Sequence, residues 1–316
     1  MGGALDPTVA TGRNLVRDAL ADLAPGTRIV VAVSGGADSL ALAAVTAFVA
    51  DRRSYELHAV IVDHRLQAGS ARVAAEAAAQ LDSLGVRSDI VAVDVGTDGG
   101  PEAAARRARH AALEATGADV TLLAHTLDDQ AETVLLGLGR GSGPRSIAGM
   151  AAVDGRWRRP FLALRRADTE QICRASGLTW WIDPHNADPA YRRVRLRTEV
   201  MPMLEDVLGG GVAEALARTA DLIRLDVDHL DEQAVREATL EVRELLAIAL
   251  PIRTRILRNA ALAAGARADE LTAGHILAMD TLVTDWHGQV RIELPGGVAC
   301  VREGGSLTFV DTPVAG

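Results

Sequence analysis

Lysine is absent from the whole sequence of 316 residues, so all 33 basic residues are arginines. A phosphate-binding loop of the Walker A type requires a lysine, and that class of nucleotide site is therefore excluded. No run of 18 uninterrupted apolar residues occurs, which argues against a membrane-spanning helix. No cationic segment near the N-terminus leads into an apolar stretch, so we expect no secretion signal and a cytoplasmic protein.

Cysteine is scarce as well. Cys173 and Cys300 lie far apart in the sequence and form no C-x-x-C pair. This spacing argues against a structural zinc site, an iron–sulfur cluster or a disulfide framework, and two reduced, partly buried thiols are expected. The remaining composition, 48% hydrophobic and 24% charged, is enough to bury a sizeable core and to form two domains.

Apolar strand patterns alternate with alanine-rich helical patterns in the first half of the chain. Strands are predicted at 28–33, 57–62, 88–93 and 120–124, and helices at 38–50, 68–84 and 101–116. Such continuously apolar strands, separated by helices, predict an α/β fold, a Rossmann-like parallel sheet with helices on both faces. Ligands bind such sheets beyond the carboxyl ends of the strands, so polar residues that follow the strands should share one cleft.

The segment Ser34-Gly35-Gly36-Ala37-Asp38-Ser39 directly follows the first predicted strand. Its glycines allow a tight turn, and the next helix offers unpaired N–H groups and its positive dipole end, an arrangement that suits phosphate. The two serine hydroxyls are further donors, and Asp38 is compatible with phosphate if Mg²⁺ bridges them. The alternative is an ordinary strand-to-helix turn in which Asp and Ser only cap the helix.

A histidine and three carboxylates follow the fourth predicted strand, within the segment AHTLDDQAET at 124–133. Asp129 and Glu132 are three residues apart and lie on neighbouring faces of the first turn of a helix. Acidic residues at this position often only complement the helix dipole. Together with His125 and Asp128 they exceed what capping needs, so they are candidates to hold Mg²⁺ or to receive a cationic amine.

These motifs resemble those of the PP-loop ATP pyrophosphatases and, taken together, those of the tRNA(Ile)-lysidine synthetase family. The 34–39 loop has the family's SGG-x-DS pattern, and the 124–133 segment is the most discriminating match. The other motifs occur in the expected order: VDHRL at 62–66, the arginine cluster at 106–110, RGSG at 140–143 with IAGM at 147–150, RPFL at 159–162, and the stretch 183–197. The resemblance covers most of residues 28–204.

The resemblance implies a ligase that works in two steps. ATP adenylates the wobble cytidine of a tRNA(Ile) with a CAU anticodon and releases pyrophosphate, and the ε-amine of free L-lysine then displaces AMP from carbon 2 of the base. The product, lysidine, changes codon reading from AUG to AUA. Two alternatives stay open, another PP-loop enzyme such as a tRNA thiolase and a non-catalytic ATP-binding module.

The resemblance also implies roles for individual residues. The residues expected to bind ATP are Ser34, Gly35, Gly36, Ala37, Asp38, Ser39, Val62 and Asp63, with Mg²⁺ on Asp38. Asp129 and Glu132 are expected to bind lysine. The expected catalytic residues are Asp38, Arg106, His125, Asp128 and Asp129, with His125 acting either as a proton relay or as a group that orients Asp128. The sequence departs from the family pattern at positions 110, 126, 185–186 and 192–193. None of these departures removes one of the expected catalytic or lysine-binding acids.

The net charge of −9 conceals a basic segment. Residues 140–200 contain twelve arginines and six acids, a local charge of +6. Planar guanidinium groups suit both phosphates and base faces, so tRNA is expected to bind there, unless the arginines form only a solvated surface. The expected tRNA-binding residues are Arg106, Arg109, Arg159, Arg193, Arg195 and Arg197.

The pattern changes after Pro202. Gly209 to Gly211 interrupt the chain, helical patterns follow at 212–239 and 241–282, and a short β meander is predicted at 289–294, 298–302 and 306–310. We expect a catalytic domain over 1–208, and a linker helix with a tRNA substrate-binding domain over 209–316. A module for stability or for dimerisation is the alternative reading of this half, and a homodimer is compatible with either.

Overall fold

The computed structural model describes residues 5–65, 69–94, 96, 101–141, 143–183 and 188–312. Motif positions 66, 142 and 185–186 lie outside these described residues. The chain divides into two compact units: the first comprises Met1–Thr133 and Met150–Ala217, and the second comprises Val134–Gly149 and Arg218–Gly316. The domain boundary expected after residue 208 stays a prediction.

A six-stranded sheet with the order β3-β2-β1-β4-β6-β5 forms the centre of the first unit. Its strands are β1 (Arg28–Val33), β2 (Glu56–Asp63), β3 (Arg87–Ala92), β4 (Val120–Leu122), β5 (Val153–Asp154) and β6 (Trp157–Arg158). All neighbouring pairs are parallel except β5 with β6. The four predicted strands and the mainly parallel sheet are confirmed, whereas the two-residue strands β5 and β6 are too short to give a sequence pattern.

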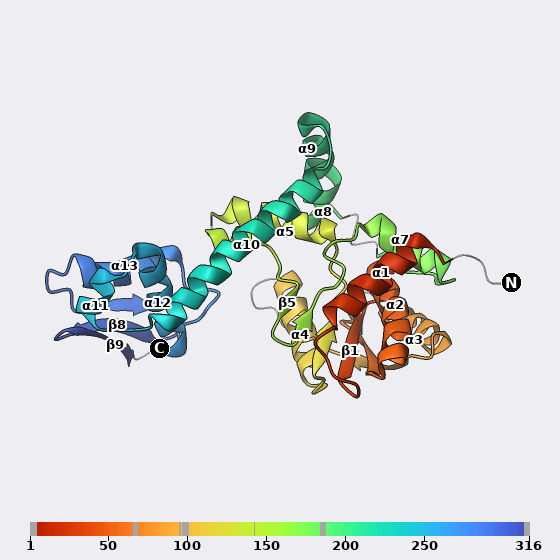
Figure 1. Cartoon of the computed structure of the whole chain (residues 1–316), viewed down its shortest axis with the longest axis horizontal. Helices are drawn as coiled ribbons and strands as arrows, with labels where there is room; N and C mark the ends of the chain where they lie inside the picture. The colour runs from red at the N-terminus through yellow and green to blue at the C-terminus, as the bar shows by residue number, and fades with distance from the viewer. Residues whose placement is uncertain are drawn as a thin grey trace. The chain divides into compact units, whose positions relative to one another are not determined.

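Helices cover both faces of this sheet (Figure 1). The alternation of side chains along β1 directs Ile29, Val31 and Val33 toward one group of helices and Val30 toward α4 on the other face. The helices are α1 (Pro7–Ala19), α2 (Ala37–Arg53), α3 (Ser70–Ser83) and α7 (Arg166–Ala175) on the first face, and α4 (Pro101–Glu114) on the second. This arrangement confirms the predicted Rossmann-like architecture.

A second helical layer of the first unit carries the acidic segment. Leu127 and Ala131 at the start of α5 (Leu127–Arg140) pack against Ala213 and Ala217 at the start of α10 (Val212–Arg236). The elements directly before α10 in the chain are α8 (Arg192–Arg195), the π-helical turn η2 (Leu196–Val200) and α9 (Met201–Leu208).

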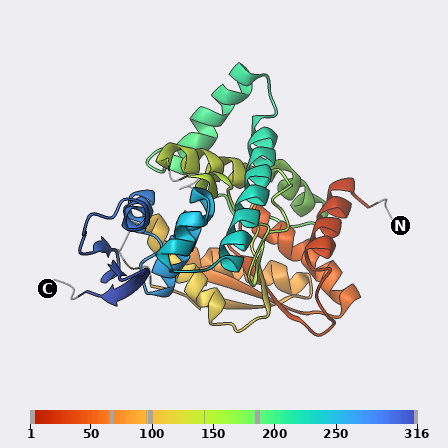
Figure 2. The same cartoon turned by 60° about the vertical axis from the view of Figure 1, so that its left-hand side comes forward.

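The chain reverses direction between α9 and α10 (Figure 2). Gly209, Gly210 and Gly211 all have φ between 71° and 89°, a conformation that glycine adopts without the steric cost that a side chain brings. The Glu205 carboxylate accepts hydrogen bonds from the backbone N–H groups of Val212 (3.1 Å) and Ala213 (3.2 Å), and so caps the start of α10.

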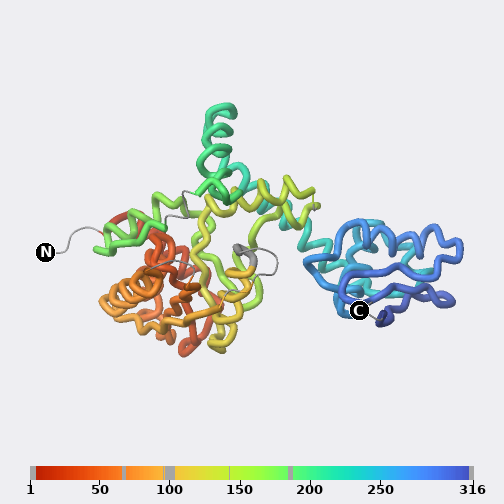
Figure 3. The backbone as a smooth tube through the Cα atoms, turned by 180° about the vertical axis from the view of Figure 1, so that it is seen from behind, coloured from red at the N-terminus to blue at the C-terminus, as the bar shows by residue number. Residues whose placement is uncertain are grey.

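The second unit has its own core, in which helices pack against a three-stranded antiparallel sheet, β7-β8-β9 (Figure 3). Its elements are the end of α5, α6 (Pro144–Ile147), most of α10, α11 (Val242–Ala247), α12 (Leu250–Ala263), α13 (Ala273–Thr284), β7 (Ile292–Leu294), β8 (Val298–Glu303) and β9 (Ser306–Asp311). The predicted helical region and terminal meander are confirmed. No helix in the described part of the chain is long and apolar enough to cross a membrane.

A buried ion pair joins α12 to α13 in the second unit. Arg253 donates from Nε to Asp280 Oδ1 (2.6 Å) and from Nη2 to Oδ2 (3.2 Å), and also donates to the carbonyl of Ile248 (2.8 Å). Removing one partner of a buried pair leaves the other charge uncompensated.

We therefore expect Asp280→Ala to lower the stability of the second unit by about 3–5 kcal/mol. Amide hydrogen exchange of α12 and α13 measures this locally, which a single melting transition of a two-unit chain does not. The control is Asp269→Ala, which removes an exposed carboxylate and is expected to change stability by no more than about 0.5 kcal/mol. If both substitutions changed the hydrogen exchange of α12 and α13 equally, the Arg253–Asp280 ion pair would not be what stabilises this unit.

Candidate active site

The predicted phosphate loop lies between β1 and α2 and has the expected backbone shape. Gly35 has φ +82°, and a Cβ atom there would lie 3.1 Å from Val73 Cγ1 of α3, so both the conformation and the space favour glycine. The Ser39 hydroxyl accepts a hydrogen bond from the Ser34 N–H (3.1 Å) and donates to the carbonyl of Gly36 (3.0 Å). The backbone N–H groups at the start of α2 are thus available to an anion.

A cavity of about 630 Å³ opens at the carboxyl ends of β1, β2 and β4, where ligands of parallel sheets bind. Most of the predicted site residues line it: Ser34, Gly36, Ala37, Asp38, Ser39, Val62, Asp63, Arg109, His125, Asp129 and Arg197. Residues that follow three different strands are therefore brought together, as the sequence pattern predicts.

Asp38 lies in the first turn of α2 at the wall of the cavity. Its carboxylate accepts a hydrogen bond from the hydroxyl of Thr169 on α7. Burial raises the pKa of Asp38 to about 6, and Asp129 contributes in the same direction, whereas the Thr169 hydrogen bond and the guanidinium of Arg166 oppose the rise. The negative charge of Asp38 is therefore costly in the ligand-free site, and a bound cation would stabilise it.

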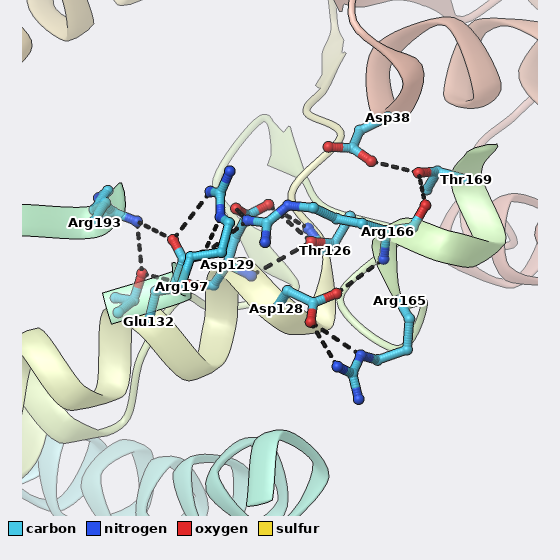
Figure 4. A network of polar contacts seen from close by, with 11 residues as sticks. Asp38, Thr126, Asp128, Asp129, Glu132, Arg165, Arg166, Thr169, Arg193 and Arg197 are labelled. Carbon is cyan, nitrogen blue, oxygen red and sulfur yellow. Dashed lines mark hydrogen bonds and ion pairs between the residues drawn. The ribbon is translucent and has the colours of Figure 1, made fainter. Parts of the chain in front are cut away.

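The acids at the start of α5 are paired with arginines (Figure 4). Asp129 accepts from the Thr126 N–H (2.8 Å) and hydroxyl (3.0 Å) on Oδ2 and from Arg166 on Oδ1. Burial would raise the pKa of Asp129, but Arg166 and the Thr126 hydrogen bonds outweigh it, so the pKa is lowered. Asp129 is therefore ionised at neutral pH.

Glu132 lies behind Asp129 and is only 1% exposed. Its Oε1 accepts from Arg166 Nη2 (3.0 Å) and Arg197 Nε (3.0 Å), and Arg193 Nη1 lies 3.9 Å from Oε2. Arg165 Nε donates a hydrogen bond to Asp128 Oδ1 (3.0 Å). Neither Glu132 nor Asp128 belongs to the described lining of the cavity, and both pair with arginines. The catalytic role of Asp128 and the binding of lysine by Glu132 stay predictions.

His125 lies beside Asp129 in the cavity wall. Burial lowers the pKa of His125 to about 3, and the nearby Arg109 adds to this effect, so the imidazole is neutral at physiological pH. Its buried Nδ1 has no hydrogen-bond partner within the described chain, and neither does Nε of Arg109. Buried polar atoms are normally paired, so both atoms are suited to a ligand in this cavity.

The other predicted arginines lie in different surroundings. Arg106 is exposed, and Arg195 is exposed and pairs with Glu199 (2.9 Å) on its own helical turn. Arg159 is buried and donates to the carbonyl of Ala151 (2.7 Å). The pocket lining in the described ranges includes none of these three, so any contact they make with RNA lies outside the cavity.

Sequence analysis missed two residues that organise the site. In the sequence Arg166 is only one member of the basic segment, and no pattern marks Thr169. Both belong to α7, and each reaches an acid in a different part of the sequence. The described residues contain no group of three or more His, Cys, Asp or Glu side chains arranged to hold a metal ion.

Comparison with known proteins agrees with this geometry. Residues 11–204 match the PP-loop domain family, and residues 240–308 match the TilS substrate binding domain. The chain is 51% identical to the tRNA(Ile)-lysidine synthase of Thermobifida fusca (strain YX), over 95% of this chain and 97% of that protein. It is 54% identical to the tRNA(Ile)-lysidine synthase of Streptomyces coelicolor, over 89% and 84% respectively.

A solved structure shares the fold at low sequence identity. The U34-tRNA thiolase NcsA from Methanococcus maripaludis, with its [4Fe-4S] cluster, superposes with a TM-score of 0.57 at 17% identity, covering 69% of this chain and 80% of that chain. This likeness supports the sheet topology alone. The two matching domains and the high identity over nearly the whole chain establish that it belongs to the tRNA(Ile)-lysidine synthase family.

Proposed function

We propose that this protein is an AMP-forming ligase that attaches L-lysine to carbon 2 of the wobble cytidine of a tRNA(Ile) with a CAU anticodon. The observation that carries the proposal is one cavity lined by both the phosphate loop and Asp129 with its arginines. A single cavity would then serve both ATP chemistry and the recognition of a charged amino acid. The chain's relatives, which match over nearly its whole length, are tRNA(Ile)-lysidine synthases.

In the proposed first step, the loop from Ser34 to Ser39 holds the pyrophosphate of ATP, and the end of β2 at Val62 and Asp63 lies near the adenine. The carbonyl oxygen of the cytosine attacks the α-phosphorus, the bond to the leaving pyrophosphate breaks, and the base becomes electrophilic at carbon 2. The N–H groups at the start of α2 stabilise the negative charge of the leaving pyrophosphate.

Mg²⁺ is compatible with the residues present. Mg²⁺ usually combines one or two carboxylates with substrate phosphates, and Asp38 supplies a carboxylate beside the loop whose ionised form a cation would favour. When bound there, Mg²⁺ would neutralise phosphate charge. The protein contributes the Asp38 carboxylate, which it holds at the cavity wall.

In the proposed second step, the ε-amine of lysine displaces AMP from carbon 2. In solution at neutral pH the ε-amine of lysine is protonated, and it must lose a proton before it attacks. Asp129, which is ionised and faces the cavity, is the proposed partner of a lysine ammonium group. Glu132 contributes by fixing Arg166 and Arg197, whose guanidinium groups line the cavity. Neutral His125 serves either as a proton relay or as an orienting group.

Binding of tRNA is proposed to combine arginines of the first unit with the region 240–308. Arg109 and Arg197 line the cavity and are proposed to contact the anticodon, whereas the exposed Arg106 and Arg195 are proposed to contact backbone phosphates. Arg159 and Arg193 are proposed to support these contacts from partly or fully buried positions. The homodimer stays a prediction.

Thiolation is not favoured by the chemistry of this chain. Cys173 and Cys300 are both buried, and burial raises the pKa of each thiol to about 12. Neither is a thiolate at neutral pH, and the thiolate is the reactive form. A non-catalytic ATP-binding module would leave the paired acids and arginines at the cavity without a role.

Incubation of the protein with ATP, Mg²⁺, labelled L-lysine and an unmodified tRNA(Ile) transcript is expected to place label in RNA, with one AMP released for each lysine attached. Mass spectrometry of the nucleosides should locate lysidine at the wobble position. A transcript with uridine at that position is the control and should accept no lysine. Release of AMP without incorporation of lysine into the RNA would contradict the proposal.

Asp38→Asn and Asp129→Asn should affect different steps. We expect Asp38→Asn to slow formation of adenylated tRNA at least about a hundredfold, because the phosphates lose the carboxylate that would hold their counter-ion. Asp129→Asn should raise KM for lysine about tenfold or more, because one charge-assisted contact is lost. Single-turnover adenylation with labelled ATP, and lysine titration, measure the two effects. Asp18→Asn, an exposed change on α1, is the control, and equal loss of both steps in both variants would refute this division of roles.

A further inference from the structure

The first turn of α7 contacts both reactive walls of the cavity (Figure 4). The Thr169 hydroxyl donates to Asp38 in the phosphate-loop helix. Arg166 Nη2 donates to Asp129 and to Glu132 Oε1 (3.0 Å) in the acidic helix α5. Residues three apart in a helix lie on one side of it, so a single turn reaches two walls that are about 90 residues apart in the sequence. We call Arg166 and Thr169 the α7 brace.

The brace is itself fixed at its start and along its length. Asp128 accepts from the backbone N–H of Arg166 (2.9 Å), which ties the beginning of α7 to α5. The Cys173 thiol donates to the carbonyl of Ala37 (3.3 Å), and Ile172 belongs to the core shared with α2. The helix that carries the brace is therefore anchored to both of the helices whose acids it contacts.

Burial makes these contacts decisive for the positions of the acids. Thr169 is fully buried, and its hydroxyl has two acceptors, Asp38 and the carbonyl of Arg166 (2.8 Å). Without this hydroxyl, Asp38 would lose the only hydrogen bond that the described chain provides to its side chain. Without Arg166, Asp129 and Glu132 would lose the group that they share, and two partly or fully buried carboxylates would face each other with less positive charge between them.

We propose that Arg166 and Thr169 are positioning residues that align the two half-reactions: Thr169 sets the position of Asp38 for adenylation, and Arg166, itself held by Glu132, sets the position of Asp129 for lysine. This inference rests on the proposed function, because it uses the roles given there to the acids. It adds that α7, whose Arg166 and Glu170 lie in the cavity lining, determines how the ATP loop and Asp129 are arranged around one base.

Thr169→Val tests the first half of the brace, because it keeps the shape of the side chain and removes the donor. We expect single-turnover adenylation of tRNA to slow about tenfold, as loss of one hydrogen bond to a charged group predicts, while KM for lysine stays within about twofold. Thr169→Ser keeps the hydroxyl and should restore adenylation to within about threefold of the unsubstituted rate. Thr11→Val, which removes an exposed helical hydroxyl on α1, is the matched control.

Arg166→Met tests the second half, because it keeps an unbranched apolar stem and removes the guanidinium. We expect KM for lysine to rise about tenfold or more, with adenylation slowed no more than about threefold. Arg166→Lys keeps the charge but lacks the planar, forked guanidinium group that contacts two acids, so it should recover only part of the affinity for lysine. Arg17→Met, which removes an exposed arginine from α1, is the control.

The two variants together decide the proposal. The proposal is supported if Thr169→Val slows adenylation alone and Arg166→Met raises KM for lysine alone. Equal loss of both steps in each variant, or recovery by Thr169→Ser of neither step, would overturn it and reduce α7 to a packing element. Amide hydrogen exchange of α2, α5 and α7 and ATP binding are measured for every variant, and a rate loss that follows faster exchange also counts against positioning. Failure of the unsubstituted protein to attach lysine would instead refute the proposed function.

Discussion

A carboxylate removed from water must have a fixed positive partner, and Glu132 is the residue at which this requirement organises the site. It is almost completely buried and is surrounded by Arg166, Arg193 and Arg197. These arginines come from α7, α8 and η2 and lie 34 or more residues after Glu132 in the sequence, so the pairing fixes distant segments around one acid. Arg166 then extends the network to Asp129 at the cavity. Removing one member of such a network costs more folding free energy than a single contact contributes, because it leaves charges buried without partners.

Much of the fold follows from patterns that the sequence displays directly. The apolar strands from Arg28 to Leu122 and the helices between them predict a parallel sheet, because buried parallel strands are apolar on both faces. The location of the cavity follows in turn, since the residues after β1, β2 and β4 must meet at one edge. The Gly35 conformation was also predictable, because a strand that turns into a phosphate-binding helix needs a residue without a side chain.

The partners of the acids were not predictable in the same way. Asp129 and Glu132 were expected to face lysine, yet the structure pairs both with Arg166, and only Asp129 lines the cavity. No local spacing links Arg166 or Thr169 to acids that lie 34 or more positions earlier. Core packing around Ile172 brings α7 to α2, and polar contacts of Arg166 with Asp128 and Asp129 join α7 to α5. Similarly, an arginine-rich segment does not reveal which members are exposed like Arg195 and which are buried like Arg159.

The paired charges around the cavity have a consequence for how ionic strength affects the substrates. Asp129 at the cavity and the acids behind it, Asp128 and Glu132, pair with Arg165, Arg166, Arg193 and Arg197, and Asp38 lies near Arg166 and Arg197. These four acids and four arginines together carry no net charge. Long-range attraction scales with net charge and is screened by salt, whereas short contacts in a partly buried wall are screened far less. Free lysine would then be selected by local geometry at nearly any salt concentration, while the arginine-dependent capture of a polyanionic tRNA would weaken steeply as salt rises.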